Sequence, residues 1–445
     1  MSLILAIDLG STSFKAAVVD RRLKVRGLGE ARLEYHFARG GEAELEVEAT
    51  WEVLRRAVRG ALQAAGVQPE SLRTATITSQ AQTFTVLDRG GRAKTRFISW
   101  QDHRATTACS TLRRCRSLAN FAAHCSFSEP LPALQISQLK HLRQAQPGFI
   151  KEDDLILKLP AYIVWRLTGI AVMDNNLAAM SGLYSLVYRD WWPSALRVCG
   201  LRREQLPHVI PAGGIARRTT YRARALGLPQ GLPLVLAGND QTSGAFGAQL
   251  HENHGLLVTL GTALVAYVCM RRMPRPHPAI VRGPYPGGLA YCLAASGSGG
   301  NVINWGQSIL AGCGTDEEFF AQAARSERGA RGLVFKLVRD GGAGTWHNVR
   351  RQHTVADFAR SMLEGLAGQV AVMVRQLGGA ASHRPVFAGG GGSRCPLFVQ
   401  IVSEALGVPI TTVSASPLLG AAMLAMASSF PAKKSAKHLV PSNGS

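Results

Sequence analysis

The chain has 445 residues, too many for a single hydrophobic core, so two domains are expected. A hydrophobic content of 46% with 18% charged residues excludes a largely disordered protein. The net charge of +21 could indicate a nucleic-acid partner, but the basic residues are scattered and no zinc-ligand spacing or basic amphipathic stripe accompanies them. We therefore expect a basic surface without nucleic-acid binding.

Cysteine usage and apolar runs indicate the compartment. The eight cysteines form no CxxC pair, which favours free thiols in a reducing environment. The first apolar run stops at Asp8 without a basic leader, unlike a signal peptide. No segment reaches the roughly 18 apolar residues that span a bilayer. We expect a cytoplasmic protein that binds small molecules and no membrane, and a homodimer is left open.

The first stretch of the chain, LILAIDLGSTSFKAAVVD (residues 3–20), predicts two strands joined by a tight turn, an antiparallel hairpin. Asp8 ends the first strand, where a carboxylate without a partner would be costly in a core. Small, hydroxylated or cationic residues follow it: Gly10, Ser11, Thr12, Ser13 and Lys15. Converging amides and hydroxyls bind anions, and a neighbouring carboxylate suits a hydrated divalent metal. The hairpin therefore predicts a site for the phosphates of a magnesium nucleotide; the alternative is an ordinary hairpin with an exposed Asp8.

The pattern after this hairpin predicts mixed helices and strands. Thr50 suits the N-cap of a helix over residues 51–65, whose apolar residues keep a three-to-four spacing, and Gly66 ends it. Residues 154–167 predict a second strong helix. Strands are predicted for residues 74–79, 83–87, 96–100 and 234–237.

A polar cluster in the first half suits recognition of a polyol. It comprises Gln82 in SQAQT and Trp100, Asp102 and Arg104 in WQDHR. An indole ring packs on the C–H face of a sugar, while charged and amide groups bind its hydroxyls. In the alternative interpretation, Asp102 and Arg104 form a structural ion pair at the end of a strand.

A single carboxylate marks the middle of the chain. Asp240 directly follows the buried strand 234–237 and two small or polar residues, in the sequence GNDQTSGAFGA. In phosphoryl transfer, an Asp in such a position orients a hydroxyl nucleophile and accepts its proton. Gln241 could bind the same substrate. The alternative is that Asp240 is the N-cap of a helix that begins near Thr242.

The opening pattern then recurs in the second half. LLVTLGTALVAYVC (residues 256–269) is again strand, Gly-Thr turn and strand, with Thr259 in the place of Asp8. One unit used twice predicts two related domains that face each other across a cleft. Four Gly-rich turns fit a nucleotide lying across that cleft, although each could simply be a turn that needs positive φ. They are residues 10–13, 261–262, 297–300 and 389–392.

These motifs resemble, in order and spacing, those of the FGGY carbohydrate kinases, over residues 3–427. The matching segments are IDLGSTSFK, SQAQT, WQDHRA, AGNDQTSGAFGA and AGGGGSRCPLFVQIVSEALGVPI with LLGAAMLA. The resemblance implies an α/β fold of the two-domain ribonuclease H-like, actin-like type, with an active site in the interdomain cleft. We expect residues 1–245 to bind sugar, residues 246–430 to bind adenosine, and residues 431–445 to form a disordered tail.

The resemblance also implies how Mg²⁺ and ATP are bound. Asp8 would help to hold Mg²⁺, which would accompany ATP. The phosphates would contact Gly10, Ser11, Thr12 and Lys15. The phosphate–ribose part would contact Gly261 and Thr262, and the adenosine pocket would be lined by Gly300, Asn304, Gly391 and Cys395.

On the substrate side, the resemblance makes Asp240 the general base, with Gln241 beside it. The residues bordering the sugar would be Gln82, Trp100, Asp102 and Arg104. Ala81-Gln82 stands where xylulokinases have Met-His and glycerol kinases have Arg-Glu, so neither specificity transfers. The sequence therefore predicts an ATP-dependent kinase of a ketose or polyol, with a pentulose such as xylulose favoured. The alternatives are an actin-like or chaperone-like ATPase without a sugar substrate, and a catalytically idle sugar-binding relative.

Overall fold

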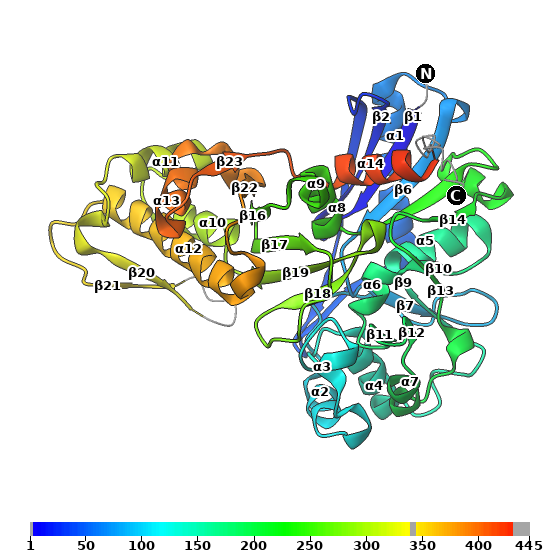
Figure 1. Ribbon diagram of the computed structural model, residues 1–445. Coiled ribbons are helices and arrows are strands. Elements are labelled where there is room, and N and C mark those ends of the chain that lie inside the picture. Colours follow the sequence, from blue (N-terminus) through cyan, green and yellow to red (C-terminus); the bar gives the residue numbers. More distant parts are fainter. Residues whose placement is uncertain (1–2, 339–343, 430–445) are drawn as a thin grey trace, which may run out of the picture.

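The computed structural model describes residues 3–338 and 344–429 and has two lobes, each built on a six-stranded sheet (Figure 1). The tail expected at 431–445 lies outside the described residues. In the N-terminal sheet the strands lie in the order β14 (Ile215–Arg218), β15 (Pro233–Asn239), β6 (Leu72–Ser79), β1 (Leu3–Leu9), β2 (Ser13–Asp20) and β3 (Val25–Arg32). The β1–β2 hairpin is antiparallel as predicted, and β6 is parallel to β1.

The hydrophobic run of β1 is continuous because both faces of its sheet are covered. Leu5 and Ile7 face the large core that includes helix α1 (Val47–Ala65). Ile4 and Ala6 face a smaller core built with the last helix, α14 (Pro417–Ser429). The C-terminal helix therefore packs on the sheet of the first domain rather than on that of the second.

The C-terminal sheet repeats the layout of the first. Its order is β18 (Val281–Tyr285), β19 (Leu289–Ser296), β17 (Leu264–Met270), β16 (Leu256–Leu260), β22 (Val386–Gly389) and β23 (Ile410–Thr412). The hairpin β16–β17 is antiparallel, and β22 pairs parallel to β16 as β6 does to β1. The order β19-β17-β16-β22-β23 thus matches β3-β2-β1-β6-β15, which confirms the predicted repeat and fold class.

The remaining elements cover these sheets. A five-stranded sheet is formed by β4 (His36–Ala38), β5 (Glu42–Leu45), β8 (Phe97–Ile98), β7 (Phe84–Leu87) and β9 (Leu155–Lys158). Short pairs are β10 (Val172–Asp174) with β13 (His208–Ile210), β11 (Tyr184–Ser185) with β12 (Asp190–Trp191), and β20 (Val334–Leu337) with β21 (Gly344–His347). The other N-terminal helices are α2 (Thr106–Arg113), α3 (Phe121–His124), α4 (Gln135–Ala145), α5 (Leu159–Thr168), α6 (Asn175–Ala179), α7 (Pro193–Cys199), α8 (Asp240–Gly247) and α9 (Leu250–Asn253). The second domain adds α10 (Gly300–Ile309), α11 (Asp316–Ala324), α12 (Val355–Leu377) and α13 (Pro396–Leu406).

Two predicted helices differ from those observed. Helix α1 begins at Val47 rather than at residue 51, so Thr50 lies inside it and its hydroxyl donates to the Glu46 carbonyl over 2.6 Å. The helix predicted over 154–167 is wrong in its first turn, because Leu155–Lys158 pairs with β7 as a strand. Pro160 then stands in the first turn of α5, where its missing N–H costs nothing.

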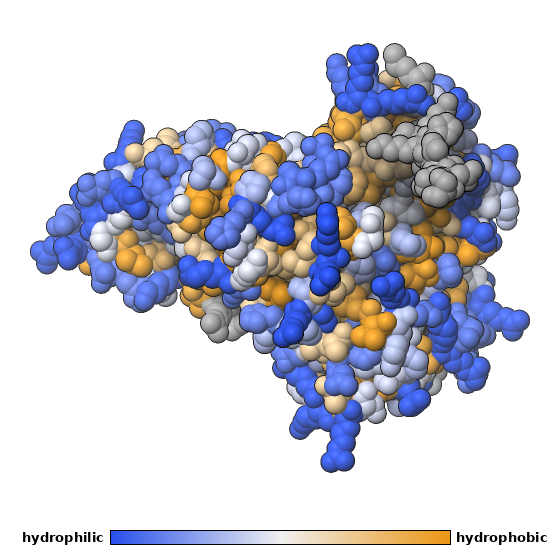
Figure 2. Space-filling model, viewed as in Figure 1, coloured by the Kyte–Doolittle hydropathy of each residue, from blue (hydrophilic) through white to orange (hydrophobic). Residues whose placement is uncertain are grey.

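The surface is predominantly polar. In Figure 2, hydrophilic side chains project around the outline of the visible face, and hydrophobic ones are concentrated nearer its centre. None of the helices in the described part of the chain combines the length and apolarity needed to cross a bilayer.

Candidate active site

Three Gly-rich segments of the second domain meet at one end of its sheet. The amide of Gly300 donates to the carbonyl of Gly261 over 2.8 Å, which joins the start of α10 to the β16–β17 turn. A Cβ at Gly299 would lie 2.7 Å from that carbonyl, and one at Gly390 would lie 2.8 Å from the carbonyl of Leu260. Only glycine permits these backbone approaches. One end of the sheet therefore carries the predicted nucleotide residues Gly261, Thr262, Gly300 and Gly391.

The two remaining candidates for the adenosine pocket, Asn304 and Cys395, lie near the same end of the sheet. Asn304 is exposed on α10, one turn after Gly300. Cys395 is partly exposed just before α13, and its thiol is free. Both α10 and α13 start next to the Gly-rich turns. The first amides of α10 are already bonded, because Gly300 and Asn301 donate to the carbonyls of Gly261 and Thr262.

The first hairpin is held by contacts from neighbouring segments. The Gly10 carbonyl accepts from Gln80 Nε2 over 3.1 Å, and the Ser11 carbonyl accepts from the Tyr35 hydroxyl over 2.8 Å. Lys15 is directly opposite Asp8 in the hairpin, and its Nζ lies 3.7 Å from a carboxylate oxygen of Glu30. Thr12 is exposed at the tip of the turn and Ser11 is partly exposed. The turn is thus fixed from behind while its tip remains open.

Asp8 lies in the electrostatic field of Asp240, although the two residues are far apart in sequence. Burial and the Asp240 carboxylate raise the pKa of Asp8 to about 7, and Lys15 acts in the opposite direction. The Oδ1 atom of Asp8 is buried and has no hydrogen-bond partner within the described part of the chain. Two strands bring them together, since β1 carries Asp8 and β15 ends next to Asp240 in the same sheet.

The N-cap of α8 is Asn239 rather than Asp240. The Oδ1 atom of Asn239 accepts from the Thr242 amide over 2.7 Å. Asp240 is the first residue of the helix, is partly exposed, and accepts from the amide of Gln241 over 2.8 Å. Burial raises the pKa of Asp240, and the hydrogen bonds from Gln241 oppose that rise. The capping role considered for Asp240 is therefore filled by its neighbour, and its carboxylate is available for chemistry.

The oxygens of this site fit a hard divalent cation. Asp8 offers an unpartnered carboxylate oxygen beside a second carboxylate. Among residues 3–338 and 344–429, no group of three or more His, Cys, Asp or Glu side chains is placed to hold a metal. Such a sparse protein contribution suits Mg²⁺, which keeps several waters and binds through one or two carboxylates together with substrate phosphates.

Asp102 and Arg104 form the structural ion pair that was the alternative interpretation. Asp102 is fully buried, and Arg104 donates to it from Nε and Nη2 at 2.6–3.0 Å. The Ala43 amide and Gln138 Nε2 also donate to the Asp102 carboxylate, over 2.9 and 3.1 Å. A second carboxylate, that of Glu44, accepts from Arg104 over 2.6 Å. Both oxygens of Asp102 are thus occupied, and the pair positions the segment that carries Trp100.

The other two sugar candidates differ from each other in exposure. Trp100 exposes 43% of its surface, unusual for an indole ring. Gln82 is buried, its Nε2 donates to the Met180 carbonyl, and its Oε1 accepts from the Gln135 amide over 3.4 Å. The backbone of Gln82 has φ = 71°, a strained conformation for a residue other than glycine.

Asn176 was not recognised from the sequence. Its Nδ2 donates to the Thr242 hydroxyl over 3.0 Å and to the Pro284 carbonyl over 2.8 Å, and its Oδ1 accepts from the Asn239 amide over 2.9 Å. This side chain joins the segment of Asp240 to the second domain. The available signal was the polar run Asp174-Asn175-Asn176 inside an otherwise apolar stretch.

Two buried ionisable residues, Lys158 and Asp174, bind the backbone of helix α6. The Nζ of Lys158 donates to the Leu177 carbonyl over 2.8 Å, and Asp174 Oδ1 accepts from the Leu177 amide over 2.9 Å. Burial lowers the pKa of Lys158 to about 7 and raises the pKa of Asp174 to about 6. Both shifts reflect the cost of a charge removed from water.

Lys158→Met is expected to stabilise the protein more at about pH 6 than at about pH 9, with a difference of roughly 3 kcal/mol. The pKa of Lys158 is 10.5 in the unfolded chain and about 7 in the folded protein. Between these values the folded protein binds fewer protons, so stability falls as the pH drops. Urea unfolding at both pH values measures the effect, with Lys336→Met, an exposed lysine of β20, as control. Equal gains at both pH values would contradict the expectation.

Comparison with known families accounts for nearly the whole chain. The model of the FGGY family of carbohydrate kinases, N-terminal domain, matches residues 3–247. The model of the C-terminal domain of the same family matches residues 256–429.

Individual relatives and solved structures agree with this match. A glycerol kinase of Deinococcus radiodurans is 27% identical over 95% of this chain and 88% of the relative. An L-fuculokinase of Salmonella typhi is 28% identical over 94% of this chain and 91% of the relative. The crystal structure of a ligand-bound xylulose kinase from Lactobacillus acidophilus superposes with a TM-score of 0.86 at 19% identity, covering 96% of this chain and 89% of that one. A Plasmodium falciparum glycerol kinase with ADP gives a TM-score of 0.83 at 16% identity over the same shares.

Proposed function

The chain belongs to the FGGY family of carbohydrate kinases, and from this premise we propose that it transfers the γ-phosphate of ATP to a hydroxyl of a ketose or polyol, with a pentulose such as xylulose as the favoured acceptor. The observation that carries the proposal is that Asp8, on β1, and Asp240, directly after β15 of the same sheet, lie within electrostatic reach of each other. Asp8 belongs to the hairpin that suits phosphates. Asp240 is the first residue of α8, and Asn239 rather than Asp240 caps that helix.

Each residue of the site has a separate role in the proposed reaction. Asp240 accepts the proton of the attacking hydroxyl, and burial raises the pKa of this carboxyl above its ordinary value. Gln241 holds the same substrate, and the open tip of the hairpin with Lys15 receives the phosphates. Asp8 would hold Mg²⁺, which when bound neutralises charge on the transferring phosphoryl group. Closure of the domains would exclude water, which prevents hydrolysis of ATP.

Substrate choice depends on Trp100 and Gln82. The exposed indole of Trp100 suits the apolar face of a sugar. Gln82 has both ends of its amide occupied by backbone groups, so a substrate would meet its side chain only by exchanging one of these bonds. Ala81 supplies no charged group. These features support an uncharged polyhydroxylated acceptor and leave its length open.

A panel of pentuloses, hexuloses, heptuloses and polyols, scored by ADP release, tests the proposal directly. We expect sugar-dependent ADP release with at least one ketose or polyol. ATP hydrolysis that no sugar alters would instead support an actin-like ATPase, and no turnover at all would support an idle relative.

Trp100→Ala is expected to raise the KM for the sugar roughly twofold to tenfold, because the loss of an aromatic contact costs about 0.5–1.5 kcal/mol. The KM for ATP should stay unchanged. Steady-state kinetics with each substrate varied in turn separates the two constants. Tyr221→Ala is the matched control, since Tyr221 is an aromatic residue with 65% of its surface exposed. A variant at Trp100 with an unaltered sugar KM would remove this residue from the proposed sugar site.

A further inference from the structure

Asn176 is fully buried, and each polar atom of its side chain has a partner on either side of Asp240 or in the second domain. Its Oδ1 atom accepts from the amide of Asn239, directly before Asp240, over 2.9 Å. Its Nδ2 atom donates to the hydroxyl of Thr242, two residues after Asp240, over 3.0 Å. The same Nδ2 atom donates to the carbonyl of Pro284 on β18 over 2.8 Å. One side chain thus binds both flanks of the proposed base and also contacts the second domain.

The end of β15 is shaped to fit against Asn176. Gly238 has φ = 78°, a conformation that residues other than glycine rarely adopt. A Cβ at Gly238 would lie 3.1 Å from Asn176 Oδ1, so a side chain there would displace the asparagine. The backbone that leads to Asp240 therefore packs directly on the Asn176 amide group.

A second buried bond connects the segment of Asp240 to the second domain. The hydroxyl of Thr242 lies 2.9 Å from the hydroxyl of Tyr267, and both residues are buried. Tyr267 belongs to β17 of the C-terminal sheet. Since Asn176 also bonds to this domain, the start of α8 is held by contacts from both lobes.

Helix α6, which carries Asn176, also reaches a residue of the proposed sugar side. Met180 directly follows this helix, and its carbonyl accepts from Gln82 Nε2. The Sδ atom of Met180 lies 3.3 Å from Nδ2 of Asn239, the N-cap of α8. Helix α6 therefore sets the position of Gln82 relative to the segment that carries Asp240.

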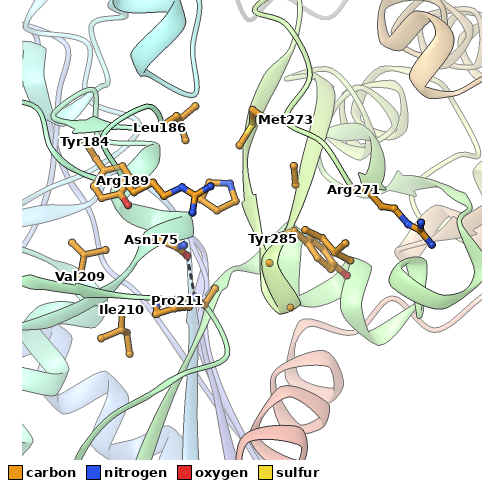
Figure 3. A pocket seen from close by; sticks show the side chains of 16 residues that line it. Asn175, Tyr184, Leu186, Arg189, Val209, Ile210, Pro211, Arg271, Met273 and Tyr285 are labelled. Atoms are coloured by element: carbon orange, nitrogen blue, oxygen red, sulfur yellow. Dashed lines mark hydrogen bonds between the residues drawn. The ribbon is translucent and has the colours of Figure 1, made fainter. Parts of the chain in front are cut away.

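Helix α6 is held in place by bonds that do not involve α8. Asn175 lines a cavity between the domains, and its Oδ1 accepts from the Ala212 amide over 3.0 Å (dashed line in Figure 3). The amide of Leu177 donates to Asp174, and the carbonyl of Leu177 accepts from Lys158. These bonds fix the helix independently of its contacts with the base segment.

We propose that Asn176 is a positioning residue for phosphoryl transfer, which orients the Asp240 carboxylate towards the acceptor hydroxyl and makes this orientation depend on the second domain. The inference rests on the proposed function, in which Asp240 is the general base. A base acts only within hydrogen-bond reach of the proton that it accepts, so a small displacement lowers the rate of transfer. Nucleotide binding should not depend on Asn176, because its bonds go to the base segment and to Pro284.

Replacing Asn176 by leucine is expected to lower kcat roughly tenfold to hundredfold while the KM for ATP stays unchanged. Leucine keeps about the same volume and removes all three hydrogen bonds. Asn176→Ala is the second variant in case the leucine variant does not fold, because its smaller side chain leaves room for water at the freed polar groups. ADP release with ATP and sugar varied in turn gives the constants, and urea unfolding shows that each variant is folded in the assay.

The matched control is Asn175→Ala. It removes the neighbouring asparagine of the same helix, which has a backbone partner at Ala212 and lacks a hydrogen bond to α8 in the described part of the chain. Its kcat should match that of the unaltered protein. Equal losses of kcat in the Asn175 and Asn176 variants would overturn the proposal, because the effect would then come from α6 in general.

A double-mutant cycle separates positioning of the base from a general weakening of the fold. Adding the Asn176 substitution to Asp240→Ala should lower turnover by less than about twofold, because no carboxylate remains to be oriented. A purely structural role would lower turnover by the same factor with and without Asp240. That additive result would overturn the proposal.

Crystal structures of the folded Asn176 variant and of Asn175→Ala locate the Asp240 carboxylate without any turnover. We expect it to be displaced in the first variant and unmoved in the second. An unmoved carboxylate in the Asn176 variant would overturn the proposal even for an active kinase. A sugar panel without ADP release would instead reject the proposed function, so the two failures are distinguishable.

Discussion

Replacing Asp240 by alanine is expected to lower turnover by roughly 10²–10⁴-fold, the contribution of a positioned general base. The carboxylate stands at the start of α8, is partly exposed, and is near enough to Asp8 to raise the pKa of that residue. ATP binding should be retained, because the phosphate hairpin and the Gly-rich turns are untouched. ADP release measures turnover, and titration of the variant with ATP measures nucleotide binding.

The control for this variant is Asp153→Ala, which removes an exposed carboxylate from a turn. Its turnover should match that of the unaltered protein. A second readout comes from Asp240→Asn, which should lower the pKa of Asp8 measured by carboxyl NMR, because the like charge that raises it is gone. Full turnover in Asp240→Ala, or an unchanged pKa of Asp8 in Asp240→Asn, would contradict the pairing on which the kinase mechanism depends.

Gly420→Ala is expected to destabilise the protein by about 3 kcal/mol or more, at the upper end of overpacking effects. A Cβ at Gly420 would lie 1.7 Å from the Ser243 carbonyl oxygen, so α14 and α8 would have to separate. Since α8 begins with Asp240, turnover should fall as well. Urea unfolding measures the stability loss, and ADP release under conditions where the variant remains folded measures the effect on turnover.

Gly368→Ala provides the opposite case. Gly368 is exposed in the middle of α12, and a Cβ there would meet no atom within 4 Å. Alanine should stabilise this helix by about 0.5–1 kcal/mol. If both glycine variants changed stability in the same direction, close packing of α8 against α14 would not explain the loss at Gly420.

Local patterns predicted the hairpins and their repetition. The runs 3–7 and 256–260 are short, apolar and followed by small residues, so both the strands and the tight turns follow from local chemistry. Their repetition indicated paired domains before any contact was known. The helix predicted at 154–167 failed in its first turn because the three apolar residues at 155–157 fit a buried strand as well as a helix, and only pairing with β7 decides between the two.

The details of the site depended on contacts that local sequence does not specify. Asp102 and Arg104 are two residues apart, and whether they bind each other or a ligand depends on Ala43 and Gln138, which come from distant elements. Similarly, Asn239 and Asp240 both suit an N-cap, and the orientation of the helix selects the first. The role of Asn176 follows only from the meeting of three segments far apart in the chain.

The position of α14 on the sheet of the first domain means that the backbone crosses from one lobe to the other twice, after α8 and again before α14. A double tether of this kind limits the lobes to rotation about an axis through the two crossings and hinders sliding. A single proteolytic cut in the first crossing would leave the two lobes held together by the packing of α14 on the N-terminal sheet. A hinge with two backbone connections can thus open for substrate and still bring the two lobes back to the same relative position.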